Sequence, residues 1–263
     1  WAAMIGLIEN LRGGATTVID HQYIHQDPTI DDQVYKAAEQ TGMRLLLARG
    51  WADIGCHPSI QETPQRILEE STRLYETYHG RAGGRLRFEF GPTIPWGCTD
   101  ETMRSTHQLA QKWKVGTHIH VAETRAEIET SIQERGARHI PWMEGLGMLS
   151  PSTQLVHSVW LDDNELELIA RNNAVVVHCP ISNMCMGTGT ARIYEMHRMG
   201  IDVALASDGP GSNNGQDMLE VLKATVMLAK TATLNASALM PKDVIWMACR
   251  GGAKAFGEPD QIG

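Results

Sequence analysis

Histidine and carboxylate residues recur at the ends of apolar, strand-like segments. His118-Ile119-His120 lies at the end of one such segment, and Glu123 follows three residues after His120. Because residues two apart on a strand share a face, both imidazoles can point to the same side. Imidazole suits Zn²⁺ or Fe²⁺, and a carboxylate just past the strand could reach a water bound to such a metal. We expect His120 to be a ligand, whereas His118 is equally well explained as a hydrogen-bonded core residue.

Two further strand ends carry residues of the same kind. His157 ends the segment Thr153–His157, one strand–helix unit after the first pair. Asp208 directly follows the apolar segment Asp202–Ser207 and precedes a Gly-rich turn. A turn-capping role alone would not explain the apolar strand before Asp208, so we expect this carboxylate to be a metal ligand or general base.

The segment Ala174–His178 ends in a polar cluster, His178-Cys179-Pro180-Ile181-Ser182-Asn183, which predicts a tight loop. We expect His178 to orient the substrate or to shape this loop. Cys179 has no fixed base beside it, so small buried packing explains it better than ligation or nucleophilic attack.

Alternating strand and helix patterns must position these residues. The expected strands are Ala15–Asp20, Met43–Arg49, Leu86–Phe90, Val115–Val121, Thr153–His157, Ala174–His178 and Asp202–Ser207. The expected helices are Trp1–Leu11, Asp31–Thr41, Glu62–Tyr78, Asp100–Lys114, Arg125–Arg135, Asp162–Arg171, Ala191–Met199, Asp217–Lys230 and Lys242–Ala255. Such alternation predicts an α/β fold with a parallel sheet, and the count favours a (β/α)8 TIM barrel with its first strand cut away. Barrel enzymes hold catalytic groups at the C-terminal ends of strands, which is where these residues lie.

Composition excludes several classes of protein. The chain has 263 residues, a formal net charge of −8 and no basic run, which argues against a nucleic-acid partner. The five cysteines form no CxxC pair, so we expect a reducing, cytoplasmic setting rather than a disulfide framework. No apolar run approaches the roughly 18 residues of a membrane span.

Four segments together resemble the signature strand ends of the amidohydrolase superfamily: THIHVAET, LVHSVWLDD, VVHCPISNMCMGTG and ALASDGPGSNN. They are most similar to the branch with the guanine, 8-oxoguanine, isoxanthopterin and adenosylhomocysteine deaminases and the triazine hydrolases (chlorohydrolases). The resemblance implies a TIM barrel of the metal-dependent hydrolase type, flanked by a small β-sandwich. It also implies one divalent metal, with Zn²⁺ expected ahead of Fe²⁺.

Carried over residue by residue, the resemblance gives each strand-end group a role. His120 would be a metal ligand, and Glu123 the acid/base that shuttles protons. His157 would hydrogen-bond the attacking water or the substrate. Asp208 would bind the metal and accept the proton of the water.

The chain departs from the family pattern at its first strand. The family's first strand carries a His-x-His pair with two metal ligands, and no such strand precedes Trp1. We therefore expect residues 1–257 to form strands two to eight of the catalytic barrel, and residues 258–263 to begin the return to a β-sandwich. Binuclear members carry a carboxylated Lys on the fourth strand, but Leu86–Pro92 contains no Lys, which favours one metal.

The expected reaction is hydrolytic deamination of a nitrogen heterocycle, and the substrate is expected to be an oxopurine or pterin. Trp51 and Trp96 could stack on a planar ring, while Arg49 or Gln22 could read an exocyclic carbonyl, although loop packing explains both Trp residues equally well. The alternatives are hydrolytic removal of chloride or an alkylamine from a triazine, and a catalytically silent barrel fragment. The only partner expected is the small heterocyclic substrate, with the full-length protein a homo-oligomer.

Overall fold

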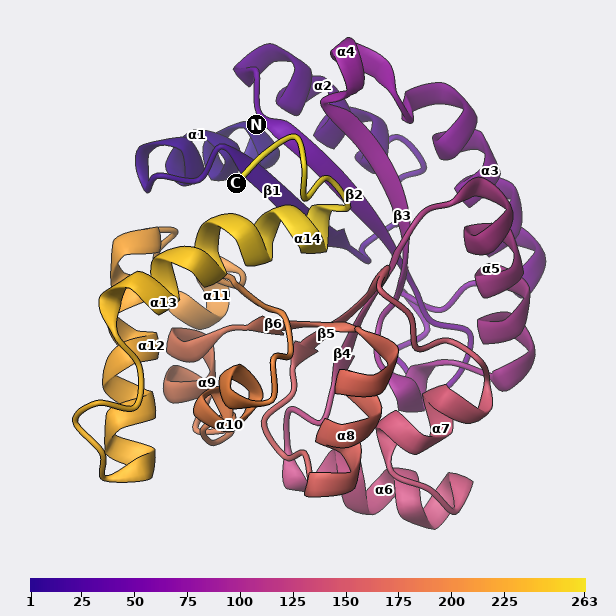
Figure 1. Ribbon diagram of the computed structural model, residues 1–263. Helices are drawn as coiled ribbons and strands as arrows, with labels where there is room; N and C mark the ends of the chain where they lie inside the picture. Colours follow the sequence, from indigo (N-terminus) through magenta and orange to yellow (C-terminus); the bar gives the residue numbers. More distant parts are fainter. The chain divides into compact units, whose positions relative to one another are not determined.

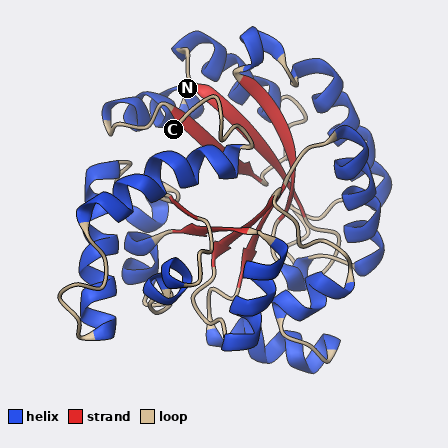
Figure 2. Cartoon of the chain, viewed as in Figure 1, coloured by secondary structure: helices blue, strands red, loops and turns tan.

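The strands of the structure neighbour one another in chain order, from β1 to β7. The structure is a computed structural model that describes residues 1–263, grouped by their internal contacts into two units, Trp1–Ile119 and His120–Gly263. The pairings β1–β2, β2–β3, β3–β4, β5–β6 and β6–β7 are all parallel. Helices connect successive strands, as Figure 2 shows. This is the α/β, TIM-barrel-type arrangement that the sequence predicts.

The first unit contains three complete strands and the start of a fourth. Its elements are α1 (Ala2–Arg12), β1 (Thr17–Gln22), α2 (Ile30–Thr41), β2 (Arg44–Trp51), α3 (Pro64–Tyr78), α4 (Arg81–Gly84), β3 (Leu86–Pro92), η1 (Pro95–Gly97), α5 (Asp100–Trp113) and β4 (Thr117–Val121), which continues into the second unit. The β1–β2 register pairs Thr17 with Arg44 and Gln22 with Arg49. Figure 1 shows β1, β2 and β3 side by side.

A single apolar core holds the first unit together. Leu45 and Leu47 from β2 and Phe88 and Phe90 from β3 are buried in it, together with residues of α2, α3 and α5. Trp113 of α5 stacks on Phe90 with ring centroids 5.6 Å apart. Each buried side chain of this size stabilises the fold by about 1.5–3 kcal/mol through burial alone, so α5 is fixed firmly against β3.

The second unit carries the remaining strand–helix pairs. Its elements are α6 (Arg125–Arg135), α7 (His139–Gly145), β5 (Thr153–His157), α8 (Asp163–Asn172), β6 (Val175–His178), α9 (Pro180–Met186), α10 (Ile193–Arg198), β7 (Val203–Leu205), α11 (Pro210–Asn213), α12 (Met218–Thr233), α13 (Pro241–Trp246), the π-helical turn η2 (Met247–Gly251) and α14 (Gly252–Phe256). The β6–β7 register pairs His178 with Leu205. Both α6 and α8 begin with a complete capping box, which fixes where each helix starts.

The sequence predicts a loop after β6, but the structure has a helix there. Pro180 occupies the first turn of α9, where proline's missing N–H costs nothing. Likewise, Pro210 begins the short helix α11 within the segment read as a Gly-rich turn. The helix expected over Lys242–Ala255 is divided into α13, η2 and α14.

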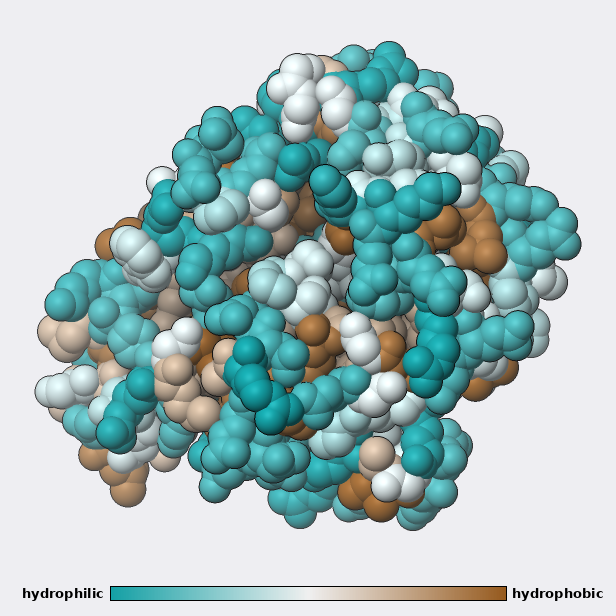
Figure 3. All heavy atoms as spheres, turned by 45° about the vertical axis from the view of Figure 1, so that its right-hand side comes forward, coloured by the Kyte–Doolittle hydropathy of each residue, from teal (hydrophilic) through white to brown (hydrophobic).

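Hydrophilic side chains dominate the face of the protein shown in Figure 3, and hydrophobic side chains lie there in separate patches. None of the helices combines the length and the apolar character needed to cross a bilayer.

Candidate active site

Four non-glycine residues at the ends of β4, β5 and β7 have a left-handed backbone. The φ values are +51° at Ala122, +66° at His157, +51° at Ser158 and +64° at Asp208. Such conformations cost on the order of 1–3 kcal/mol each and persist where surrounding contacts enforce them, commonly at functional sites. Three of the strand ends chosen from the sequence, those of β4, β5 and β7, are therefore followed or ended by residues in this conformation.

His157 and Glu123 face each other across the ends of β5 and β4. The Nε2 atom of His157 lies 3.6 Å from Oε2 of Glu123. On the other side of the ring, the Asn183 side-chain amide donates to His157 Nδ1 over 3.1 Å. An Nδ1 that accepts a hydrogen bond leaves the proton on Nε2, so the N–H of His157 is directed toward Glu123. His120 stacks on the same ring, with centroids 5.4 Å apart.

Asp208 is held as a carboxylate by hydrogen bonds from its own loop and from α9. The hydroxyls of Ser182 and Ser212 donate to its Oδ2 over 2.6 and 3.1 Å, and the Gly209 N–H donates to its Oδ1 over 2.7 Å. Burial raises the pKa of Asp208, but the hydrogen bonds from Ser182 and Gly209 and the nearby His157 outweigh it. The pKa of Asp208 thus falls below its ordinary value, and the group stays ionised.

Glu123 is shifted in the opposite direction. Burial, followed by the charges of Glu127 and Asp208, raises its pKa to about 7. A carboxyl group with that pKa can both give and take a proton near neutral pH. Two neighbouring carboxylates whose environments separate their pKa values are the usual arrangement for paired acid and base roles.

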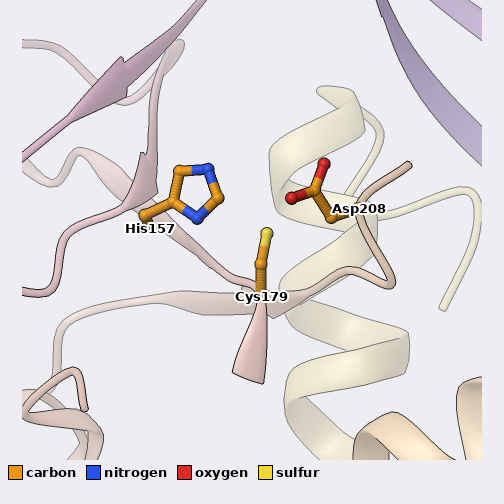
Figure 4. Close-up of side chains that lie close together, drawn as sticks. All are labelled: His157, Cys179 and Asp208. Atoms are coloured by element: carbon orange, nitrogen blue, oxygen red, sulfur yellow. The ribbon is translucent and has the colours of Figure 1, made fainter. Parts of the chain in front are cut away.

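Three potential metal ligands converge in the second unit, as Figure 4 shows. One ligand atom from each of His157, Cys179 and Asp208 lies within 4.8 Å of the other two. The expectation that Cys179 is a small buried residue agrees with its 1% exposure, but the sequence did not indicate that it faces His157 and Asp208. Burial, and then the charges of Asp208 and Glu123, raises the pKa of the Cys179 thiol.

His178 is buried beside this group. Burial, followed by the charge of His157, lowers its pKa to about 3, so the ring is neutral. Its Nδ1 atom is buried without a hydrogen-bond partner. A neutral imidazole at this position can accept or donate a hydrogen bond but carries no charge to the site.

The residues of the first unit that were expected to bind substrate differ in how far they are buried. Arg49 is buried, and its two terminal nitrogens bind Glu62 over 2.7 and 2.8 Å. Trp51 is 1% exposed, whereas Trp96 and Gln22 are half-buried. The guanidinium of Arg49 therefore serves an internal ion pair.

The two histidines of the His-x-His segment have different neighbours. The His118 ring lies 5.2 Å from that of His21, and its Nδ1 lies 4.0 Å from Oε1 of the buried Glu89. His120 instead stacks on His157 in the second unit. This favours the core interpretation for His118.

Sequence reasoning assigned no role to several residues of the site, namely Ser182, Asn183, Ser212 and His139, although the first two belong to the polar cluster noted after β6. Ser182 and Asn183 follow β6 by only four and five residues, so a search of the first helical turn after each strand would have found them. His139 lies in α7 and has no such signal, because only the tertiary fold brings it to Ala122.

Comparisons with known proteins show the family to which the chain is related. The amidohydrolase family model matches residues 1–263. The 5'-deoxyadenosine deaminase of Methanobrevibacter smithii is 34% identical over 261 residues, which are 99% of this chain and 58% of that protein. The 5-methylthioadenosine/S-adenosylhomocysteine deaminase of Desulfitobacterium hafniense is 35% identical over 260 residues, 99% of this chain and 57% of that protein.

Solved structures show the same likeness. The zinc-bound adenosine deaminase of Xanthomonas campestris superimposes with a TM-score of 0.91 at 27% identity, covering 99% of this chain and 57% of that one. A zinc complex of the atrazine chlorohydrolase of Arthrobacter aurescens gives 0.93 at 26% identity, with 98% and 59% covered. The chain thus spans less than three fifths of these relatives' length. With the family model matching its whole length and the strand-end histidines and carboxylates in place, this chain belongs to the amidohydrolase family.

Proposed function

We propose that this chain carries catalytic residues of a metal-dependent aminohydrolase, which removes an amino group from a nitrogen heterocycle with water. The observation that carries the proposal is the pair of carboxylates beside His157. The pKa of Glu123 is raised to about 7 while the pKa of Asp208 is lowered. One group is therefore suited to donate a proton and the other to accept one.

A divalent metal fits the donors at the strand ends. Imidazole nitrogen and carboxylate oxygen are ordinary zinc ligands, and we assign His120 and Asp208 to the metal from their strand-end positions. The ligand atoms that lie within 4.8 Å of one another are those of His157, Cys179 and Asp208, so Asp208 is the member common to both sets. Burial is the main reason that the pKa of Glu123 is raised, and repulsion from Glu127 and Asp208 adds to it; a cation at the site would relieve the repulsion from Asp208. Zinc is named in two of the related structures, and we propose it for this chain. Such an ion supplies an activated water by lowering its pKa to about 7.

The protein's own groups would handle the protons. Asp208 accepts a proton from the water while the oxygen of the water forms a bond to the amine-bearing carbon of the substrate. Glu123 protonates a ring nitrogen, then takes the proton of the added hydroxyl group and passes it to the amine, so that the C–N bond breaks, a carbonyl forms and ammonia departs. The proton held by Asp208 then restores Glu123. His157 donates from Nε2 to the oxygen of the tetrahedral intermediate, a role that its Asn183 hydrogen bond favours. Each acid/base step is worth roughly 10²–10⁴-fold in rate.

For the substrate, we propose an adenosine derivative modified at its 5' carbon. The relatives above 30% identity are named as deaminases of 5'-deoxyadenosine, 5-methylthioadenosine or S-adenosylhomocysteine. The ion pair between Arg49 and Glu62 weakens the case for an arginine that reads a ring carbonyl. Trp96 and Gln22, which are half-buried, and His178 remain candidates for substrate contacts.

The oxopurine or pterin substrate expected from the sequence stays a prediction and is the competing candidate. A triazine chlorohydrolase or alkylaminohydrolase would use the same residues with another leaving group. The 26% identical chlorohydrolase structure is the observation that keeps this alternative in view.

Product release by the full-length, zinc-loaded enzyme distinguishes these substrates. Ammonia would be measured with 5'-deoxyadenosine, 5-methylthioadenosine, adenosine, 8-oxoguanine and isoxanthopterin, and chloride with a chlorotriazine. We expect the highest kcat/KM with 5'-deoxyadenosine or 5-methylthioadenosine. A higher value with 8-oxoguanine or isoxanthopterin would restore the oxopurine prediction. Chloride release alone would reassign the enzyme as a triazine hydrolase, and no product from any substrate would favour a silent barrel.

A further inference from the structure

We propose that His139 is a positioning residue that holds Glu123 in its working orientation through the backbone of Ala122. His139 lies in the first turn of α7 and is completely buried. Its hydrogen bond is to the backbone of Ala122 and not to a side chain assigned to the reaction. The inference rests on the proposed function, because it concerns the placement of the proposed proton shuttle.

The imidazole is bound to the residue immediately before Glu123. The N–H of Ala122 donates to Nδ1 of His139 over 2.9 Å. Ala122 has a φ of +51°, a conformation that costs an L-residue about 1–2 kcal/mol and so needs contacts to maintain it. A hydrogen bond to a buried acceptor is such a contact, and losing it would leave the Ala122 N–H unpaired.

The carbonyl group of Ala122 is also held by hydrogen bonds. The Ala122 carbonyl accepts hydrogen bonds from the N–H groups of Val159 and Trp160 over 3.0 and 2.8 Å. Ser158 donates to the carbonyl of Val121 over 3.1 Å. Ala122 is therefore held between α7 and the segment that follows His157. By holding Ala122, His139 fixes the backbone from which Glu123 approaches His157.

The contact requires an imidazole without a proton on Nδ1. Burial, followed by the charges of Arg135 and Arg138, lowers the pKa of His139 to about 4. The buried Glu165 of α8 also faces this region, since it binds Arg138 and accepts from the Ile140 N–H. His139 therefore remains a neutral acceptor near pH 7, and an asparagine side-chain oxygen could take the place of Nδ1.

The test compares full-length, zinc-loaded wild type with His139→Ala, His139→Asn and the control His197→Ala, which alters an exposed histidine of α10. Replacing a residue that orients a catalytic group typically lowers activity by about 10–100-fold. We therefore expect His139→Ala to lower kcat by about that factor with little change in KM. We expect His139→Asn to recover most of the activity, His197→Ala to match wild type, and zinc content to stay constant. Amide exchange at Ala122 should accelerate in His139→Ala.

Unchanged kcat and unchanged Ala122 exchange in His139→Ala would overturn the inference. If that variant does not fold, the ¹⁵N resonance of wild-type His139 decides: an unprotonated Nδ1 at pH 7 supports the contact, and a protonated one contradicts it. An inactive wild type would contradict the proposed function instead. In that case the Ala122 exchange rates would still show whether His139 holds this segment.

Discussion

At the scale of single residues, two carboxylates of the second unit have pKa values shifted in opposite directions by their surroundings. Asp208 receives hydrogen bonds from Ser182, Ser212 and the Gly209 backbone, which stabilise its charged form. Burial and the charges of Glu127 and Asp208 disfavour the charged form of Glu123. The low pKa of Asp208 therefore depends mainly on serine hydroxyls and a backbone N–H, which a search for histidines and carboxylates does not include.

His139 gives a residue-scale prediction about stability and pH. Its pKa is about 4 in the folded protein and about 6.5 when unfolded, so between these pH values only the unfolded chain binds the proton. The stability from this group is therefore complete above pH 6.5 and is lost as the pH falls toward 4. One pKa unit corresponds to about 1.4 kcal/mol, so the loss should be about 3 kcal/mol.

Urea unfolding at several pH values between 7 and 4 measures this effect. Other carboxylates also titrate in this range, so the informative quantity is the difference in slope between wild type and His139→Asn. The variant cannot titrate at this position and should lose less stability on acidification. Equal slopes for the two proteins would show that His139 is not buried as a neutral group.

At the scale of elements, the close approach of η2 to β7 depends on one glycine. A Cβ built on Gly251 would lie 1.9 Å from the carbonyl oxygen of Val203, although the backbone of Gly251 is helical. The next residue, Gly252, is also helical but has nothing within 4 Å of such a Cβ. Because both glycines are helical and only Gly251 packs against β7, comparing them separates the effect of packing from the effect of backbone conformation.

We expect Gly251→Ala to lower the free energy of unfolding by about 1–3 kcal/mol or more, since η2 must move away from β7. Gly252→Ala is the matched control and should be neutral or stabilising by up to about 1 kcal/mol, because alanine favours helix. Chemical denaturation of both variants checks this. Similar destabilisation by the two substitutions would mean that the glycines are needed for their backbone freedom and not for the β7 contact.

Many of the helices and strands were predictable from the sequence. The strand Thr153–His157 and the helix Arg125–Arg135 have the predicted bounds; a capping box marks the start of the helix. The helices α9 and α11 were missed because Pro180 and Pro210 read as loop signals, whereas each proline begins a helix. The strand-end residues of the site were found, but Asn183 and His139 act through contacts with residues 26 and 17 positions away, which no local pattern reveals.

At the scale of the whole molecule, the family match extends over the full 263 residues, while the relatives are longer than this chain. The proposed activity therefore belongs to the full-length protein. Within this chain, the proposed chemistry depends on His120, Glu123, His157 and Asp208. Two contacts join members of this set. The rings of His120 and His157 stack, and Nε2 of His157 lies 3.6 Å from Oε2 of Glu123.

The most direct test of this account is ammonia release by full-length, zinc-loaded Glu123→Gln, measured with 5-methylthioadenosine. Glutamine keeps the shape of the side chain but cannot shuttle a proton. We predict that kcat falls by at least about 100-fold while zinc content and folding remain those of wild type. Glu129→Gln, on the exposed side of α6, is the control and should retain full activity. Wild-type turnover by Glu123→Gln would contradict the assignment of Glu123 as the proton shuttle.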